Sequence, residues 1–438
     1  MRAGRILAAI LLIGGLIGVL IRGGEVYTRF LYLGLLLFIV SWLWTQISLR
    51  GVEVKRRARS LRASVGDMFE EHFEFTNDSR FGKLWIELSN DTNMPNAAGS
   101  RLLTMIGPKQ KRSYIARTWL SRRGGFRLGP TRLVSGDPFG IFRLEKILPA
   151  EHSLLVLPMI YEISSFIAPP GLLPGGKVIR RKALDVTPHA AGVREYVPGD
   201  PMKRIHWPTT ARRGRLVVKE FEQDPQAEVW LFLDAQYTVH FSKPYEYPEI
   251  HRDGWLFSQR PKFELPPSTL EYAISITASL AHYFLRQRRA VGLVTTGRKY
   301  AILPAEQGER QEGKILETLA FIEAESALSI AGLVTAQAGQ LPQGSSAILV
   351  TPTVFPELLA AVDDLQRRNL RPVVVLLIAD TFGGSKGGEK LYSTLFERNV
   401  PVCRINCGAD LSLELSGFSA SIASQEYSWQ RPPLSHLT

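Results

Sequence analysis

An acidic residue stands directly after a short, fully apolar run in the second half of the chain. Residues 229–233 read Val-Trp-Leu-Phe-Leu and are followed by Asp234. Apolar strands that alternate with helices form parallel sheets, and ligands of such sheets bind beyond the carboxyl ends of the strands. A second apolar run, 347–350, is followed by Thr351. We therefore expect any chemistry of this region at Asp234 and around Thr351.

The segment 237–267, which follows Asp234, is long, polar and aromatic, and it carries His240 and His251. Loops of this length are usually functional or disordered. One hypothesis is therefore a hydrolase-type enzyme that uses Asp234 and this insertion. The sequence shows no Ser-His-Asp ordering, no paired-carboxylate motif and no nucleotide fingerprint. We accordingly assign no catalytic residue and do not expect an enzyme.

A second group of residues with chemical potential lies between 192 and 222, where charged and aromatic residues alternate with turn residues. Arginine binds carboxylates through two parallel hydrogen bonds, and aromatic rings stack on planar groups. The segment could bind an acidic partner, or its arginines could pair with local acids and fasten it to its neighbours. The residues singled out are Arg194, Glu195, Tyr196, Pro198, Gly199, Asp200, Arg204, His206, Trp207, Arg212, Gly214, Lys219 and Glu220.

The positive charge of the protein is concentrated in two blocks. The chain has 438 residues and a formal net charge of +12. Residues 1–62 carry ten Lys and Arg against two acids, and residues 177–220 carry eleven against four. A basic protein can bind nucleic acid or an anionic membrane. No nucleic-acid-binding motif accompanies either block, so we expect no nucleic-acid partner.

Two apolar segments near the N-terminus predict a membrane anchor. Residues 6–21 and 30–49 contain no charged side chain. Twenty helical residues span about 30 Å, the thickness of a bilayer core. Basic residues precede the first segment and follow the second, so the positive-inside rule places both ends in the cytoplasm. We expect a two-pass hairpin over 1–50 in the inner cell membrane, with membrane lipid as a partner and all soluble domains cytoplasmic.

The region 51–150 has the pattern of a small β-sandwich of Ig-like type. Short alternating runs at 72–75 and 84–88 predict half-buried strands, and turn residues separate them. Asp137, which precedes a proline, is expected to form a turn. After this region, we expect residues 151–228 to pack between two domains.

The region 229–408 has the pattern of a doubly wound α/β domain. Apolar runs at 229–233, 291–295, 347–350, 373–378 and 401–405 predict strands. Helices are expected at 269–286, 312–322, 356–368 and 389–398. Residues 409–438 show weak patterning and end in a proline-containing sequence, so a flexible tail is expected.

Several motifs of this chain resemble one family. Residues 194–200 read R-E-Y-V-P-G-D, 204–207 read R-I-H-W, and 211–222 read A-R-R-G-R-L-V-V-K-E-F-E. With R-R-G-G-F-R-L-G-P at 122–130 and D-P-F-G at 137–140, they resemble the domain of unknown function 58 family over essentially the whole chain. The resemblance implies a bacterial protein with a von Willebrand A-like (Rossmann-like) domain, often found with MoxR-type AAA+ ATPases, and no established activity. His206 departs from the Asp common in the family, which puts a carboxylate ligand there in doubt.

A von Willebrand A-like domain implies a metal-ion-dependent adhesion site. That site begins with D-x-S-x-S after the first strand and holds Mg²⁺ through oxygen ligands. The corresponding residues here are Asp234, Gln236 and Thr238, and the usual later Asp is replaced by the sequence Thr-Pro-Thr at 351–353. The resemblance therefore implies a degenerate Mg²⁺ site at most, and no cofactor is expected. The alternative is that Asp234 caps a helix or bonds nearby amides.

The leading hypothesis is a membrane-anchored cytoplasmic interaction module. The family resemblance implies a MoxR-type AAA+ ATPase as its partner in the assembly or maturation of another complex. The alternatives are the hydrolase described above and a non-catalytic scaffold for envelope processing. The sequence leaves the oligomeric state open.

Overall fold

The computed structural model describes residues 2–149, 152–167, 190–197, 202, 205–221, 228–246, 263–298 and 300–418. The chain divides into two compact units. The first comprises residues 1–159 and 246–264, and the second comprises 160–245 and 265–438. Each unit is described by itself.

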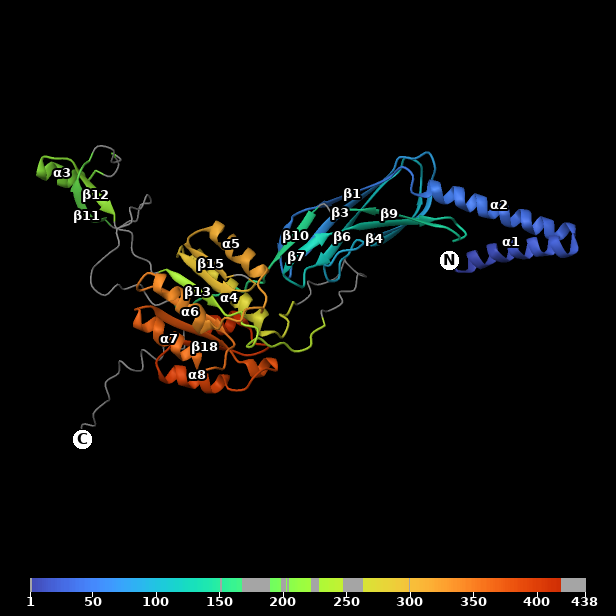
Figure 1. Ribbon diagram of the computed structural model, residues 1–438. Helices are drawn as coiled ribbons and strands as arrows, with labels where there is room; N and C mark the ends of the chain where they lie inside the picture. The colour runs from blue at the N-terminus through green and yellow to red at the C-terminus, as the bar shows by residue number, and fades with distance from the viewer. Residues whose placement is uncertain are drawn as a thin grey trace, which may run out of the picture. The chain divides into compact units, whose positions relative to one another are not determined.

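The first unit begins with two antiparallel helices, α1 (Arg2–Arg22) and α2 (Glu25–Ser48), drawn in blue in Figure 1. Gly23 has φ 64° in the connection, a conformation that glycine adopts without strain. The helices approach closely, because a Cβ at Gly15 would lie 2.7 Å from the backbone nitrogen of Leu31. Both helices are long and apolar enough to cross a membrane.

The rest of the first unit is built from strands that form two packed sheets and a smaller third one. One sheet has the order β1-β3-β6, the second β5-β4-β8-β9 and the third β2-β10-β7. The strands predicted at 72–75 and 84–88 lie in β3 and β4 and confirm the alternating pattern. The strands are β1 (Val52–Ala58), β2 (Arg62–Ser64), β3 (Met68–Asn77), β4 (Lys83–Asn90), β5 (Arg101–Ile106), β6 (Lys111–Trp119), β7 (Gly124–Leu128), β8 (Thr131–Gly136), β9 (Arg143–Leu148) and β10 (His152–Leu157).

The core of this β region lies between the two larger sheets. Phe73 and Phe75 of β3 are fully buried against Ile86 and Leu88 of β4 and Leu133 of β8. These residues stand at every second position of their strands, which directs one face of each sheet inward. Burying five such side chains contributes about 1.5–3 kcal/mol each relative to exposure.

A buried lysine joins the β region to the end of α2. Nζ of Lys83 donates hydrogen bonds to the carbonyl oxygens of Ile47, at 2.7 Å, and Arg50, at 3.0 Å. The last carbonyls of a helix lack intrahelical partners and carry the negative end of its dipole. Lys83 therefore caps α2, although burial lowers the pKa of its ammonium group.

Replacing Lys83 with methionine should loosen the end of α2. Without the ammonium group, two carbonyls lose their donor, at a cost of about 1–2 kcal/mol. Faster hydrogen exchange of the amides at 49–52 in the detergent-solubilised chain would show this. Lys55→Met is the control, because Lys55 forms only an exposed pair with Glu53 and should change exchange by less than about 0.5 kcal/mol. Equal effects of both variants would contradict the capping role.

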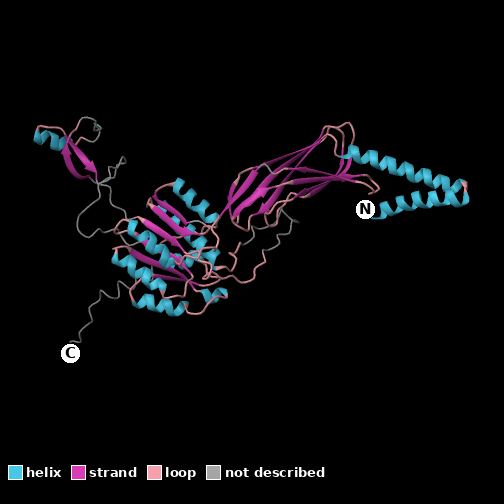
Figure 2. Ribbon diagram, in the orientation of Figure 1, coloured by secondary structure: helices cyan, strands magenta, loops and turns pink. Residues whose placement is uncertain are grey.

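The second unit contains a six-stranded mixed sheet covered by helices on both faces, as Figure 2 shows. The strand order is β15-β14-β13-β16-β17-β18, and β15 alone is antiparallel to its neighbour. The strands are β13 (Val229–Leu233), β14 (Val291–Thr296), β15 (Tyr300–Glu306), β16 (Ser346–Thr351), β17 (Arg371–Leu377) and β18 (Val402–Ile405). The helices are α4 (Thr269–Arg286), α5 (Glu309–Ala320), α6 (Ile330–Gln337), α7 (Glu357–Arg367) and α8 (Gly388–Glu397), with short 3₁₀ helices at Ala338–Gln340 and Ala379–Phe382.

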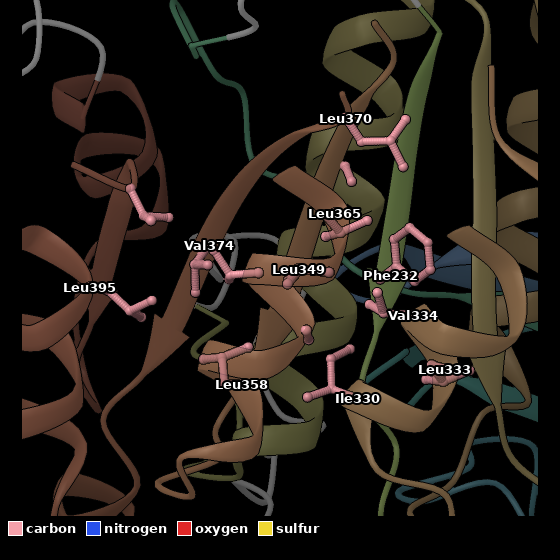
Figure 3. Packing of buried hydrophobic residues seen from close by; sticks show 14 of the residues in the cluster. Phe232, Ile330, Leu333, Val334, Leu349, Leu358, Leu365, Leu370, Val374 and Leu395 are labelled. Carbon is pink, nitrogen blue, oxygen red and sulfur yellow. The ribbon is translucent and has the colours of Figure 1, made fainter. Parts of the chain in front are cut away.

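One face of this sheet packs against α6, α7 and α8. Figure 3 shows Phe232, Leu349 and Val374 of three neighbouring strands facing Val334 of α6 and Leu358 of α7. Successive residues of a strand point to opposite faces, so Leu231 and Leu233 face the other side, where α4 packs against β13 and β16. A sheet buried on both faces explains why β13, β14 and β16 are continuous apolar or small-residue runs.

Residues 160–167 and the helical residues 411–418 are fastened to the same unit. The amide of Ser164 donates to Oγ of Ser416 at 3.0 Å, and the ring of Phe166 contacts Phe418, 5.4 Å between centroids. Phe166 also meets Phe284 of α4. The sequence predicts a flexible tail over residues 409–438. Residues 411–418 instead form a helix, because Leu411, Leu415 and Phe418 at helical spacing are buried. Residues 419–438 lie outside the described residues.

Candidate functional site

Asp234 lies where the direction of strand addition in the sheet reverses. The sheet order, numbered from β13, is 3-2-1-4-5-6, and the reversal falls between β13 and β16. Ligand sites of doubly wound sheets form at this point, beyond the carboxyl ends of the strands. Asp234 follows β13, and Thr351 ends β16. The structure brings together the two residues that sequence patterning singled out.

The carboxylate of Asp234 is enclosed by hydrogen-bond donors. Oγ1 of Thr351 donates to one oxygen at 2.6 Å, and the amide of Gln236 donates to the other at 3.0 Å. The side chain of Asp234 is 0% exposed. Burial raises the pKa of this carboxyl to about 6, although the two hydrogen bonds oppose the shift. The Asp234–Thr351 bond thus joins β13 to β16 across the place where a ligand would enter.

The loop after Asp234 is fixed on its other side by Ser326. The amide of Tyr237 donates to the Ser326 carbonyl at 2.9 Å, and the Ser326 amide donates to the carbonyl of Ala235 at 3.2 Å. Oγ1 of Thr296, at the end of β14, donates to Oγ of Ser326 at 2.7 Å. Sequence patterning missed Ser326, because a single serine 92 positions from Asp234 carries no periodic signal.

His240 ties the same loop to the start of α4. Its Nε2 lies 2.9 Å from the carbonyl oxygen of Asp234, and its Nδ1 lies 3.0 Å from Oγ1 of Thr269. Burial lowers the pKa of the imidazole to about 4, so the ring is neutral near pH 7. A carbonyl oxygen only accepts, so Nε2 carries the proton and Nδ1 accepts from Thr269. His251, the other histidine of the insertion, lies outside the described residues.

The three residues expected to ligate Mg²⁺ differ in their exposure to solvent. Asp234 is buried, Gln236 is half-buried and Thr238 is exposed. Both carboxylate oxygens of Asp234 already accept hydrogen bonds from the protein. Among the described residues, no three His, Cys, Asp or Glu side chains gather as a metal site would require. The arrangement suits a hydrogen-bonded link between β13 and β16 better than it suits a divalent cation. We therefore assign no metal chemistry to this site.

The basic segment singled out in the sequence forms a hairpin that carries a short helix. β11 (Ala190–Glu195) pairs antiparallel with β12 (Val217–Phe221), and α3 (Trp207–Arg213) precedes β12. In this register Arg194 stands opposite Val218, and Glu195 stands opposite Val217. The hairpin thereby collects Arg194, Glu195, Tyr196, His206, Trp207, Arg212, Gly214, Lys219 and Glu220, whereas Pro198, Gly199, Asp200 and Arg204 lie outside the described residues.

Two residues of the motif shape the ends of α3. His206 is the N-cap residue, and its Nδ1 lies 2.7 Å from Oγ1 of Thr209. Gly214 follows α3 with φ 64°, and its amide donates to the carbonyl of Thr210 at 3.0 Å. A glycine is favoured there because the left-handed conformation strains other residues.

The outer surface of α3 is basic and aromatic. None of the seven residues of α3, all of which are described, is buried, and Trp207 is 64% exposed. Arg212 and Arg213, in its last turn, are exposed and form no ion pair with another described residue. Arg215, by contrast, pairs with Glu195. Among the described side chains of the hairpin, internal pairing therefore involves Arg215 and leaves the α3 pair facing solvent.

The hairpin and Asp234 fall within a segment shared with known proteins. A family model described as "Protein of unknown function DUF58" matches residues 192–250. Uncharacterized protein YeaD of Bacillus subtilis (strain 168) is 24% identical over 320 residues, which cover 70% of this chain and 71% of that protein. The chain thus carries a segment that matches the DUF58 family model and is similar to YeaD over most of its length. The DUF58 match begins inside β11 and continues past β13, so it contains α3 and the loop that follows Asp234.

A solved structure also shows a weak likeness. It is a chain in the crystal structure of the complex between Zinc 2-glycoprotein and Prolactin inducible protein from human seminal plasma, 10% identical, covering 24% of this chain and 92% of that chain. Its TM-score is 0.18, which assigns no fold.

Proposed function

We propose that this protein is a membrane-anchored interaction module. Helices α1 and α2 would cross the inner membrane as a two-pass hairpin, with both ends and both soluble units in the cytoplasm. The support is their length and apolar composition, together with the basic residues that flank them. Only Arg22, Arg29 and Glu25 lie in or near the connection.

The fold types of the two soluble regions are part of the proposal. The sheet order 3-2-1-4-5-6 with an antiparallel edge strand supports a von Willebrand A-like second unit. The two packed sheets of the first unit support an Ig-like sandwich. In the second unit we assign Asp234 a structural role, because an enclosed carboxylate cannot reach a substrate without movement of its loop.

The partner surface is the exposed face of α3. Trp207 at the start of α3 and Arg212 and Arg213 in its last turn are exposed and suit a carboxylate-rich partner, because guanidinium groups bind carboxylates bidentately and an exposed indole gains contact area in a complex. The exposure of these three side chains is the single observation that carries the proposal. We propose a MoxR-type AAA+ ATPase as the partner, in the assembly or maturation of another complex.

Reversing the charge of α3 should abolish partner capture. In the variant Arg212→Glu/Arg213→Glu, recovery of the ATPase after crosslinking of membranes and purification of the full chain should fall about tenfold or more, because two attractive contacts with partner carboxylates become repulsive. Quantitative mass spectrometry of the purified complex measures this.

The matched control is Arg367→Glu. Arg367 is also an exposed arginine in the last turn of a helix, α7, so reversal of this one charge opposes a helix dipole in the same direction as each substitution in α3. Capture should stay at the wild-type level in this variant. Equal capture by the α3 variant and wild type would place the partner surface elsewhere, and failure of wild type to capture an ATPase would exclude that partner.

A further inference from the structure

The turn between β8 and β9 supplies hydrogen-bond acceptors for its own backbone N–H groups. Asp137 is 1% exposed, and its carboxylate accepts three hydrogen bonds from amides of the turn. The amide of Gly140 donates to the carbonyl of Asp137 at 3.3 Å, and Pro138 has no N–H group. All backbone donors of residues 138–142 therefore have acceptors inside the turn. The donors to the carboxylate are Phe139 at 2.9 Å, Ile141 at 3.2 Å and Phe142 at 2.6 Å.

A loop at the edge of a bilayer needs its backbone N–H groups to be hydrogen-bonded within the protein. Hydrocarbon offers no hydrogen-bond partner, so backbone that approaches it must be paired within the protein. The sequence predicts Asp137 as a turn former, and the structure confirms this and shows that its carboxylate pairs the whole turn.

The turn lies against both apolar helices. Nε of Arg5 in α1 donates to the carbonyl oxygen of Ile141 at 3.0 Å. The ring of Phe142 meets that of Phe38 in α2 edge-on, with centroids 5.0 Å apart. Phe38 precedes the last residue of α2 by ten positions, about 15 Å along the helix axis. The turn therefore reaches beyond the end of α2 and alongside its apolar length.

The turn also touches the first residue of the candidate span in α1. That span is Gly4–Ile21. A Cβ at Gly4 would lie 1.9 Å from the carbonyl oxygen of Phe139, so the backbones of helix and turn are in contact there. The side chain of Phe139 is 51% exposed. The exposed ring of Phe139 thus lies level with the N-terminal end of the candidate membrane span in α1.

Other exposed apolar side chains gather at the same end of the β region. Phe81 and Leu84 flank Lys83, which caps α2, and Met105 precedes Ile106, the residue paired with Lys83. Aromatic and apolar side chains at this depth, with arginines such as Arg5 and Arg50 beside them, are typical of the boundary between headgroups and acyl chains.

We propose that residues 138–142 insert into the headgroup–acyl boundary of the bilayer that α1 and α2 cross, with Phe139 in contact with lipid. This inference rests on the membrane anchoring proposed above. It makes the β8–β9 turn a second attachment of the first unit and fixes the orientation of its sheets to the membrane surface.

Fluorescence quenching in lipid nanodiscs tests the insertion. Cys403 and Cys407, the two cysteines of the chain, are first replaced with serine. An environment-sensitive nitrobenzoxadiazole label is then attached to a single new cysteine in Phe139→Cys, Ile147→Cys or Ile13→Cys. Ile147 is the matched control, because it is 59% exposed and stands in β9 at the opposite end of the same hairpin. Ile13 reports on the middle of α1.

The label at 139 should lose about half of its fluorescence when the lipids carry a spin label near the headgroup, as expected for a ring at the acyl boundary. The label at 147 should lose none, and the label at 13 should respond most to a spin label near the chain end. Quenching at 13 with equal, negligible quenching at 139 and 147 would overturn the insertion and leave the anchoring intact. Absence of quenching at 13 would overturn the anchoring itself.

Discussion

Replacing Arg56 with alanine is expected to lower the free energy of unfolding of the first unit by about 3–5 kcal/mol. Glu71 of β3 is fully buried, and the guanidinium of Arg56 lies 2.7 Å (Nε) and 2.6 Å (Nη2) from its Oε1. Burial raises the pKa of Glu71, and the charge and hydrogen bond of Arg56 oppose that shift. Removal of the arginine leaves the buried Glu71 carboxylate without the positive charge and hydrogen bond that offset its burial. Hydrogen exchange of β3 amides in the detergent-solubilised chain measures the loss.

Arg117→Ala is the control for this prediction. Arg117 pairs with Glu70, one position along the same strand, at 2.9 Å but with more solvent around it. Its loss should therefore cost less than about 1 kcal/mol. The double variant Arg56→Leu/Glu71→Leu should recover most of the lost stability, because it removes both buried charges. A double variant as unstable as Arg56→Ala would show that packing around Arg56, over the ring of Phe73, dominates over charge.

The second unit is expected to lose stability as the pH rises toward neutrality, and Asp234 is the cause. Its pKa is raised from 3.8 to about 6 in the folded chain, so the fold binds this proton more tightly than the unfolded chain does. The contribution of the protonated carboxyl is fully present below pH 3.8 and is lost as the pH rises through about 6. The difference between these limits is about 3 kcal/mol.

Asp234→Asn should remove this pH dependence, because an amide does not titrate. Thr351→Val should enlarge it, because the hydroxyl that stabilises the carboxylate is lost. Exchange protection of the β13 and β16 amides between about pH 5 and pH 7, corrected for the intrinsic rate, is the measurement. If the asparagine variant keeps the wild-type pH profile, another group controls it.

The six-stranded sheet of the second unit and the helices that cover it are largely predictable from sequence, apart from β15 and α6. Buried strands such as β13 and β16 are continuous apolar runs, and α4 has a strong helical period, so local pattern and burial agree. The edge strand β15 was missed because it alternates exposed and half-buried residues and lies outside the apolar core. The helix α6 was missed because its eight residues carry no charge to mark a solvent-facing side.

The candidate site was predictable in position but not in chemistry. The end of β13 identifies Asp234, and sheet geometry brings Thr351 beside it. Whether the carboxylate faces solvent or lies enclosed depends on how the loop after Asp234, which carries His240, contacts Thr269 and Ser326, two residues from distant parts of the chain. The exposure of Trp207 and Arg212 also has no local sequence signal, because turn-rich basic segments can pack inward or outward.

Contacts join residues 160–167 to residues 411–418, and they constrain the order in which the chain folds during synthesis. Ser164 and Ser416, joined by a hydrogen bond, are 252 positions apart. Domains generally fold as units as the chain leaves the ribosome. The strands β1 to β10 can pair as soon as they emerge. Phe166 and Phe284, by contrast, can contact Phe418 only after residue 418 has left the ribosome, so a nascent chain that stalls before this point exposes these rings to chaperones and proteases.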